Sequence, residues 1–365
     1  MPTEFQLELL GLSLQQLTDV VEKMGEPRYR ASQLFSAIYR QRVTDLEELS
    51  TFPKKLRSRL ALDGHSIGLP AVEQRFKSVD GTVRYLLRFK DGQSVETVWM
   101  PDGDGAEDED EPTKLASPGN RRGTICISSQ AGCAVNCRFC MTALLGLQRN
   151  LSAGEIVGQV LLVLSDHGIE IGRDRINLVF MGQGEPFLNY ENFMAAVRLL
   201  VEGTGIPESR MTVSTSGIVP RIADFGGEAV RPHLAISLNG SNDEVREHVM
   251  PINRKWKIED LIDAARRFPL RSRERVTFEY VLLAGVNDSV ANAREVVSLL
   301  SGIRAKVNLI ALNPGPEIPF STPTPEDVAA FQQTLIAAGI PAYLRRPRGL
   351  DIYAACGQLK RTMEG

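Results

Sequence analysis

Two kinds of segment alternate along the chain from residue 123 to residue 345. Short runs rich in β-branched side chains are followed by longer stretches with helical spacing of their apolar residues. Because a helix that connects two strands of one sheet leaves them parallel, this alternation predicts an α/β fold, either a barrel or a doubly wound sheet. The predicted strands span residues 123–128, 175–182, 210–216, 233–239, 275–282, 305–312 and 341–345. The predicted helices span residues 153–166, 190–203, 257–267, 288–301 and 325–338.

Polar or glycine residues close nearly every predicted strand. They are Gly182 to Glu185, Ser214, Ser237 to Asn239, and Asn313. In parallel α/β folds the active site forms at the carboxyl ends of the strands. The pattern therefore favours a barrel-type site at that edge.

The chain before this region divides into three further parts. Residues 12–62 have helical periodicity, and residues 71–101 alternate apolar and polar side chains around Asp91-Gly92, which predicts a β-hairpin with Glu96 in its second strand. An acidic, Pro- and Gly-containing segment follows and has the composition of a solvated insertion. The predicted division is 1–66, a helical RNA-binding-like domain; 67–101, the hairpin; 102–120, the insertion; 121–350, the core barrel; and 351–365, a C-terminal segment.

The charge of the chain depends on that acidic segment. The 365 residues have a formal net charge of −3, but residues 102–111 hold seven acids, and without them the balance is +4. Residues 23–59 hold nine Lys or Arg against four acids, which fits either a solvated face or a phosphate-contacting surface. No apolar run approaches the ~20 residues that span a bilayer. The first ten residues carry two acids and no Lys or Arg, so no secretory signal is expected.

Three of the five cysteines, Cys133, Cys137 and Cys140, form a C-x3-C-x2-C pattern after the first predicted barrel strand. This odd, clustered set does not suit a disulfide scaffold and fits a cytoplasmic protein with reactive thiols. A closed structural zinc site needs a fourth ligand, and the nearest candidate is the distant His167. Three thiolates leave one position open, as in a 4Fe-4S cluster with a free iron. A zinc site completed by a distant ligand and unrelated buried thiols are the alternatives.

The cysteine pattern, with Phe139 before its last cysteine, resembles that of the radical S-adenosylmethionine (SAM) superfamily. Residues 124–133, 249–253 and 351–359 resemble one branch of it, the RlmN/Cfr adenine methyltransferases. The resemblance covers nearly the whole chain. It implies an α/β fold with a partial, open TIM-type (β/α)6 radical SAM barrel, a small N-terminal helical domain and a β-hairpin. It also implies a 4Fe-4S cluster and SAM as cofactors, with Cys133, Cys137 and Cys140 as the cluster ligands.

The resemblance assigns the SAM contacts to the strand ends. Gly184 and Glu185 match the family element that holds the SAM ammonium group. The other implied contacts are Ser214, Ser237, Leu238, Asn239 and Asn313. Gln183 and Asn239 stand where the family usually has Met and His, so this chain departs from the pattern at two positions.

Cys356, Cys126 and Glu96 are the catalytic residues that the resemblance implies. Adenine C2 is electrophilic, so the family uses two SAM molecules. The first methylates the Cys356 thiolate, and the second, reduced through the cluster, yields a radical that takes a hydrogen from that methyl group. The resulting carbon radical adds to C2, Glu96 removes the C2 proton, and Cys126 attacks Cys356. This attack leaves a disulfide that an external thiol system reduces.

The implied substrate is an adenine of 23S rRNA, with tRNA as a further substrate. The implied partners are an electron donor for the cluster and a thiol reductant for the Cys126–Cys356 disulfide; no membrane partner is expected. Base extraction requires phosphate contacts. The candidates are Arg28, Arg30, Lys54, Lys55, Arg57, Arg345, Arg346 and Arg348.

Three other functions are compatible with these residues. The C8-methylating branch shares every cysteine named above. Gln183, Asn239 and Tyr353 deviate from the common pattern, which leaves open a different RNA target. An RNA-binding or sensor protein with an iron-sulfur cluster and no turnover is the non-enzymatic alternative.

Overall fold

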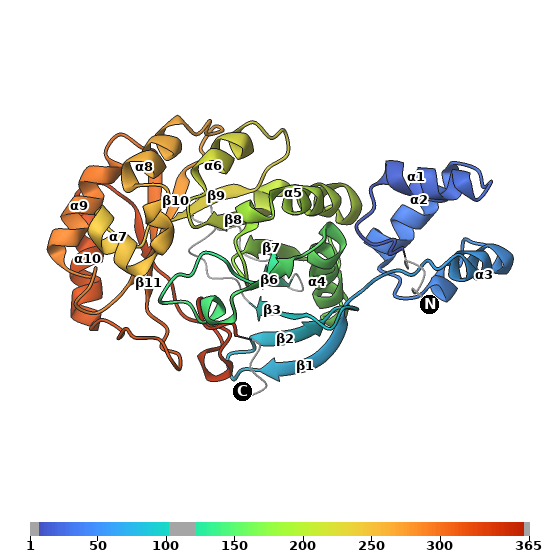
Figure 1. The fold of residues 1–365 in the computed structure, drawn as a ribbon, viewed down its shortest axis with the longest axis horizontal. Helices are drawn as coiled ribbons and strands as arrows, with labels where there is room; N and C mark the ends of the chain where they lie inside the picture. The colour runs from blue at the N-terminus through green and yellow to red at the C-terminus, as the bar shows by residue number, and fades with distance from the viewer. Residues whose placement is uncertain (1–6, 102–120, 361–365) are drawn as a thin grey trace.

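A ten-stranded mixed sheet organises the computed structural model, which describes residues 7–101 and 121–360 (Figure 1). Its strand order is β1-β2-β3-β4-β7-β8-β9-β10-β11-β12. The parallel strands are β4 (Arg122–Cys126), β7 (Arg175–Phe180), β8 (Met211–Thr215), β9 (His233–Ser237), β10 (Val276–Leu282), β11 (Ala305–Ala311) and β12 (Ala342–Leu344). Since β4 and β12 do not pair, the described sheet is an open barrel, which confirms the predicted fold class.

Helices connect successive parallel strands and cover the outside of the barrel (Figure 1). They are α4 (Ala153–Asp166), α5 (Tyr190–Leu199), α6 (Val219–Gly226), α7 (Asp243–Val249), α8 (Ile258–Arg267), α9 (Val290–Leu300) and α10 (Pro325–Ala337). The sequence did not predict α6 and α7, because helices of eight and seven residues are too short to show a periodic pattern.

The predicted hairpin is present and extends the barrel sheet. Strands β2 (Val83–Arg88) and β3 (Ser94–Pro101) pair antiparallel, and β1 (Ala71–Lys77) adds to β2. The free edge of β3 pairs with β4, which places Val98 opposite Cys126. The strand that carries Glu96 therefore lies directly beside the strand that carries Cys126.

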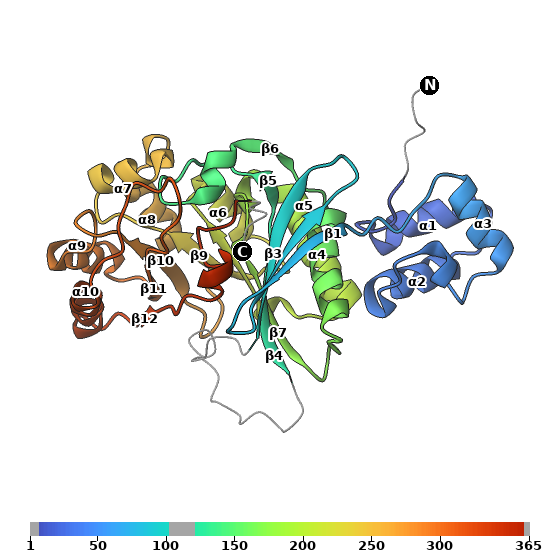
Figure 2. The ribbon, with the colours of Figure 1, turned by 90° about the horizontal axis from the view of Figure 1, so that it is seen from below.

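The N-terminal helices lie to one side of the barrel, next to α4 and α5 (Figures 1 and 2). They are α1 (Leu14–Lys23), α2 (Tyr29–Ser36) and α3 (Lys54–Leu62). Ser13 and Gln16 form a capping box that begins α1. A π-helical turn, Ala37–Gln41, follows α2. Arg42, the next residue, donates to the Ile169 carbonyl at 2.8 Å and so joins the N-terminal helices to the barrel.

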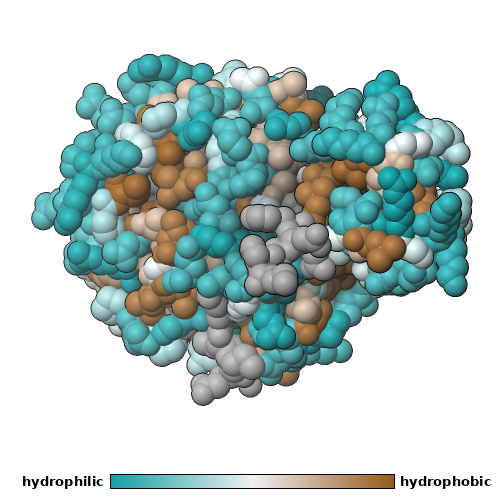
Figure 3. Space-filling model, turned by 45° about the vertical axis from the view of Figure 1, so that its right-hand side comes forward, coloured by the Kyte–Doolittle hydropathy of each residue, from teal (hydrophilic) through white to brown (hydrophobic). Residues whose placement is uncertain are grey.

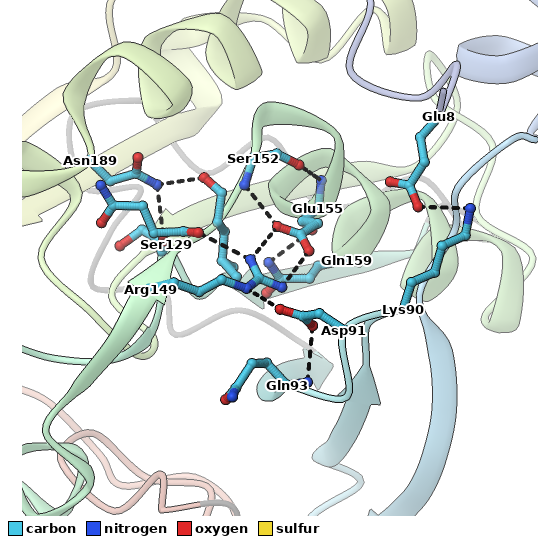
Figure 4. A network of polar contacts seen from close by, with 12 residues as sticks. Glu8, Lys90, Asp91, Gln93, Ser129, Arg149, Ser152, Glu155, Gln159 and Asn189 are labelled. Carbon is cyan, nitrogen blue, oxygen red and sulfur yellow. Dashed lines mark hydrogen bonds and ion pairs between the residues drawn. The ribbon is translucent and has the colours of Figure 1, made fainter. Parts of the chain in front are cut away.

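A polar network fixes the hairpin loop to the barrel (Figure 4). Arg149 in β6 (Leu147–Asn150) binds Asp91 at 2.5 Å and Glu155 at 2.7 Å, and Glu155 also closes the capping box of Ser152 at the start of α4. Lys90 pairs with Glu8 at 3.1 Å and ties the same loop to the N-terminal segment. The two carboxylates raise the pKa of Arg149 further. Because β6 pairs with β5 (Gln130–Gly132), this network supports the start of the cysteine loop.

One face of the molecule is mostly polar (Figure 3). On the face in Figure 3, hydrophilic side chains surround small, separate apolar patches. In the range 7–101 and 121–360, no helix has the length and apolar character needed to cross a bilayer.

Candidate active site

A cavity of about 160 Å³ opens at the carboxyl ends of the barrel strands. We call it the cluster cavity, because Cys133, Cys137 and Cys140 all line it. Of the seven SAM contacts implied by the sequence, six also line it: Gly184, Glu185, Ser214, Ser237, Asn239 and Asn313. The fold thus brings together the ends of β7, β8, β9 and β11 with the cysteine loop.

Backbone hydrogen bonds hold the cysteine loop over the barrel. Cys133 donates its N–H to the Gly146 carbonyl at 3.1 Å, and Arg138 donates to the Val249 carbonyl at 2.9 Å. Cys137 and Phe139 pack against an apolar cluster that contains Val249. Residues 249–253, which the sequence singled out, therefore act as a support for the cysteine loop.

The three thiols lie close enough to affect one another's ionisation. Burial raises the pKa of Cys133 to about 12, and it raises the pKa of Cys137 well above its ordinary value. The neighbouring cysteines raise both further, and burial also raises the pKa of Cys140. A cationic metal centre would reverse this effect, since it stabilises the thiolate forms that bind it.

The arrangement of these thiols fits an iron-sulfur cluster better than a single ion. Among the described residues, no three His, Cys, Asp or Glu side chains are placed to hold one metal ion. In a 4Fe-4S cluster each cysteine binds a different iron, so its ligands lie farther apart than those of one zinc ion. Three soft thiols on one enclosed cavity therefore match the cluster and disfavour the zinc alternative.

Glu185 is a buried acid held by backbone donors. Gly184 before it has φ 97°, and a Cβ there would lie 2.5 Å from the Cβ of Gln130, so only glycine fits. The Glu185 carboxylate accepts N–H groups from Ser216 at 2.6 Å and from Phe187 at 3.0 Å. Burial nevertheless raises its pKa. A cation at this position, such as the ammonium group of SAM, would favour the charged form.

The other expected SAM contacts differ in position. The hydroxyls of Ser214 and Ser237 lie 3.3 Å apart, and Asn239, with φ 53°, accepts the Val281 N–H at 2.7 Å. Asn313 donates to the Cys356 carbonyl at 3.1 Å, so it also positions the C-terminal segment. Leu238 does not line the cavity, because its side chain faces the apolar core.

Cys126 and Cys356 meet at a second cavity, of about 80 Å³, which we call the relay cavity. Cys126 is buried at the end of β4, whereas Cys356 is exposed. Cys356 lines both cavities, so it lies between the cluster cysteines and Cys126. The structure contains no disulfide between any of the five cysteines, all of which lie among the described residues.

Hydrogen bonds fix the segment that carries Cys356. Met141, next to Cys140, donates its N–H to the Gly357 carbonyl at 2.7 Å, and the Thr142 hydroxyl donates to the Leu359 carbonyl at 2.7 Å. Figures 1 and 2 both show this C-terminal segment beside β1–β3. The segment that carries Cys356 is thus attached directly to the cysteine loop.

Glu96 is fully buried and lines neither cavity. Its carboxylate receives hydrogen bonds from Arg84 at 2.5 Å and from Gln183 at 3.1 Å. Arg84 is also fully buried, and a cation at this distance favours the ionised carboxylate. Glu96 thus belongs to a buried ion pair, because the C-terminal segment packs on the face of the hairpin that Glu96 shares with Leu86 and Val98.

Besides Arg84, two buried charged residues at the site, Arg246 and Glu279, were missed in the sequence. Arg246 in α7 donates to the carbonyls of Ser216 and Leu238. Burial lowers the pKa of Arg246 to about 10, and the charge of Arg246 in turn lowers the pKa of Cys137. Glu279 in β10 lines both cavities. A single acid in an otherwise apolar strand was the available signal for Glu279; Arg246 in a charged helix had none.

The expected RNA contacts fall into two groups. Arg345, Arg346 and Arg348 line the relay cavity. In the N-terminal unit Arg28 pairs with Glu22, Arg57 pairs with Glu47, and Arg30 binds Gln33 and the Thr51 carbonyl. Lys54 and Lys55 are exposed. The acidic insertion lies outside the described residues.

An open parallel barrel with three cysteines in the loop after its first parallel strand defines a radical SAM protein. Residues 127–296 match the family model for the radical SAM superfamily, and residues 7–63 match that for the ribosomal RNA large subunit methyltransferase N-terminal domain. The chain is 66% identical over 342 residues to a probable dual-specificity RNA methyltransferase RlmN of Koribacter versatilis, covering 94% of this chain and 98% of that protein.

Two further proteins agree with this assignment. A dual-specificity RNA methyltransferase RlmN of Granulibacter bethesdensis is 43% identical, with 97% and 87% of the two chains covered. The crystal structure of a radical SAM methyltransferase from Sphaerobacter thermophilus superimposes with a TM-score of 0.87 at 44% identity, covering 97% of this chain and 99% of that one. The chain belongs to the RlmN family of radical SAM methyltransferases, and a 4Fe-4S cluster and SAM are its cofactors.

Proposed function

We propose that this chain methylates C2 of adenine in 23S rRNA and in tRNA. One observation carries the proposal: Cys356 lines both the cluster cavity and the relay cavity that contains Cys126. A methyl carrier must face the cofactors in one step and a second thiol in another. The relatives' printed names, which describe dual-specificity RNA methyltransferases, and the match of residues 7–63 support an RNA substrate of two kinds.

Cys356 is the proposed methyl carrier. When bound, the cluster and SAM supply an electrophilic methyl group and the one-electron chemistry that abstracts hydrogen. The Cys356 side chain is exposed, and its neighbours Ala355 and Gly357 are small enough to let a cofactor approach. Its thiolate is the nucleophile that takes the methyl group.

Cys126 is the proposed resolving thiol. Its thiolate attacks the sulfur of Cys356 in the protein–RNA adduct, so that the S–S bond forms and the S–CH2 bond to the adenine breaks. The released CH2 carbon takes up a proton, which gives methyladenine. Two electrons from an external thiol reductant then restore both thiols. This requirement suits a reducing, cytoplasmic compartment.

Glu96 is the proposed acceptor of the C2 proton. Glu96 and Val98 share one face of β3, and Val98 pairs with Cys126, so the carboxylate lies near the relay thiol. Arg84 keeps it in the ionised form that a base requires. Since Glu96 lines neither cavity, this role requires the RNA-bound state to bring adenine and carboxylate together.

The proposed RNA path runs over the relay cavity. Arg345, Arg346 and Arg348 supply cations at its wall, where they can bind the phosphates that flank an extracted adenine. Lys54 and Lys55 add exposed positive charge on the N-terminal unit.

The test is to incubate the reconstituted protein with a reductant, labelled SAM and rRNA or tRNA fragments, and to identify the methylated nucleoside by mass spectrometry. We expect 2-methyladenosine together with 5′-deoxyadenosine. 8-Methyladenosine would assign the chain to the other branch, and no 5′-deoxyadenosine would support a sensor without turnover.

Two cysteine variants separate the proposed steps. Cys356→Ala should carry no methyl label on the protein. Cys126→Ala is the matched control, because it should still load the label and then accumulate a covalent protein–RNA adduct. Equal behaviour of both variants would contradict the relay.

A further inference from the structure

The turn between β1 and β2 is hydrogen-bonded to the C-terminal segment that carries the proposed methyl carrier. The Ser78 hydroxyl donates to the Asp351 carboxylate at 2.5 Å, and the Val79 N–H donates to its other oxygen at 3.2 Å. Ser78 and Asp351 lie 273 positions apart in the chain, so only the tertiary fold brings them together. Both oxygens of one carboxylate therefore hold the turn and the segment against each other.

A second carboxylate joins the same two parts in the opposite direction, since here the acid belongs to the turn. The Asp80 carboxylate accepts the Gly349 N–H at 3.0 Å and, with its other oxygen, the Thr82 N–H at 2.8 Å. Burial raises the pKa of Asp80, but these hydrogen bonds outweigh it and lower the pKa to about 2. Ionised Asp80 therefore orders the turn and binds the segment at the same time. We call the contacts of Asp80 and Asp351 the hairpin clamp.

The clamped stretch of the C-terminal segment is a single tight turn. Leu350–Ile352 form one 3-10 turn, with Gly349 at φ 60° before it and Tyr353 at φ 51° after it. A Cβ at position 349 would lie 2.7 Å from the Cβ of Ala354 and 2.9 Å from the Cγ2 of Thr82, so only glycine allows this contact with the hairpin. A tyrosine at positive φ is strained, and such strain persists only where the surrounding contacts hold the backbone.

After the clamped turn, the segment packs on the surface that contains the proposed resolving thiol. Ile352 and Ala354 belong to the same small apolar cluster as Cys126. Cys356 follows Asp351 by five positions and lines the relay cavity together with Cys126. The clamp therefore fixes where the carrier lies over the relay cavity.

We propose that Asp351 and Asp80 are positioning residues of the methyl relay, and that they hold Cys356 within reach of Cys126. This inference rests on the proposed function, in which the two thiols form a disulfide as methyladenine leaves. Both acids are among the described residues and neither lines the cluster cavity or the relay cavity, so each acts through the backbone of the segment. A segment held in place raises the effective concentration of one thiol at the other, because less chain entropy is lost when the disulfide forms.

The test measures the equilibrium between the Cys126–Cys356 disulfide and glutathione in the reconstituted full-length protein, without RNA. In this exchange oxidised glutathione takes two electrons and two protons from the two thiols and becomes two molecules of reduced glutathione. The equilibrium constant is the effective concentration of the two thiols. Peptide mapping after alkylation of the free thiols gives the fraction of protein that carries this disulfide. In the proposed assignment the cluster occupies the other three cysteines, and the exchange is carried out without oxygen to preserve it.

Asp351→Ala removes both acceptor oxygens of its half of the clamp. We expect the effective concentration to fall about fivefold or more, because two hydrogen bonds are lost. Asp351→Asn keeps one acceptor oxygen and should lose less. The matched control is Asp174→Ala in the loop before β7, because Asp174 also accepts two backbone N–H groups, from Glu170 at 2.9 Å and Arg121 at 3.1 Å. This loop lies at the amino end of the barrel, so its loss should leave the equilibrium unchanged.

Two further variants test the halves of the clamp separately. Asp80→Asn weakens the contact with Gly349 and should also lower the effective concentration. Ser78→Ala should lower it alone but add almost nothing to Asp351→Ala, because the contact between the two side chains is already lost there. If Asp351→Ala fails to fold, Asp351→Asn and Ser78→Ala give the same comparison with the control.

Three outcomes would overturn the proposal. Equal effective concentrations in wild type and the clamp variants would show that the clamp does not position Cys356, and a rise would show that it holds Cys356 away from Cys126. Equal losses in Asp351→Ala and Asp174→Ala would assign the effect to general destabilisation. Absence of the disulfide in wild type at every glutathione ratio would instead contradict the relay itself, and this inference with it.

Discussion

Each end of the open barrel holds a buried carboxylate, and the two are stabilised in different ways. At the carboxyl end, Glu185 accepts hydrogen bonds from the N–H groups of Ser216 and Phe187, and burial raises its pKa. At the amino end, Glu274 is paired with Arg231 and its pKa falls to about 2. Arg231 supplies the counter-charge for Glu274, whereas in the part of the chain that the structure describes no Lys or Arg pairs with Glu185.

This difference bears on the proposed SAM site at the carboxyl end. The ammonium and sulfonium groups of SAM are cationic, and in that proposal Glu185 is the partner of the ammonium group. At the amino end, Arg231 already neutralises Glu274 inside the protein. The two buried acids therefore differ in whether an arginine of the protein is hydrogen-bonded to them.

The largest effect on this comparison should come from removing Arg231. Arg231→Gln leaves Glu274 buried without its cation, and we expect the free energy of unfolding to fall by about 3–5 kcal/mol. Urea denaturation measures this loss. The control is Arg254→Gln, which breaks an exposed pair with Glu247 and should cost less than about 1 kcal/mol. Equal losses would show that the amino-end pair is not stabilising.

A pH titration of wild-type stability is the next test. Glu274 has a native pKa of about 2 against an ordinary 4.5, so its contribution is present above the ordinary pKa. It is lost as the pH falls from about 5 toward 2, with a total of about 2–3 kcal/mol. Glu274→Gln should lack this part of the acid dependence when both proteins are unfolded in urea across that range. Parallel curves would contradict the depressed pKa.

At the carboxyl end, Glu185→Gln should mainly weaken the binding of SAM. Loss of a charged partner for an ammonium group corresponds to about 1.5–3 kcal/mol, or roughly tenfold or more in the dissociation constant. Equilibrium dialysis of the reconstituted protein with labelled SAM gives this value. Glu259→Gln, an exposed acid on α8, is the control. Unchanged SAM affinity would mean that Glu185 only orders the strand-end loop.

Much of the fold could be predicted because strand and helix periods are local properties of the sequence. The predicted helix at 153–166 matches α4, and each predicted barrel strand overlaps an observed one. The fusion of the hairpin to the barrel through β3 and β4 could not be predicted, because it depends on pairing between distant segments. The burial of Glu96 has a similar origin, because the distant C-terminal segment packs on the face of the hairpin that Glu96 shares with Leu86 and Val98.

The site divides in the same way. The cysteines and the residues at strand ends could be predicted, because spacing and motif mark them in the sequence. Arg246 and Arg84 could not, since a charged side chain normally lies at the surface. Their burial follows from the tertiary packing of α7 and β2.

The smallest effect should come from Gln183, which lies in the same loop as Glu185 and contacts the other buried acid, Glu96. Its Nε2 donates to Glu96 at 3.1 Å, while its Oε1 is buried without a partner among the described residues. Gln183→Met removes a hydrogen bond to a carboxylate, worth about 1.5–3 kcal/mol, and also removes a buried unsatisfied oxygen that costs about 1–3 kcal/mol. The two effects oppose each other, so we expect the free energy of unfolding to change by less than about 1 kcal/mol in urea denaturation. Gln183→Glu is the contrasting variant, because it places a second carboxylate beside Glu96 and should destabilise clearly more. If Gln183→Met were as damaging as Gln183→Glu, the amide rather than Arg84 would be the main partner of Glu96, and the carboxyl end would hold two acids that depend on neutral donors.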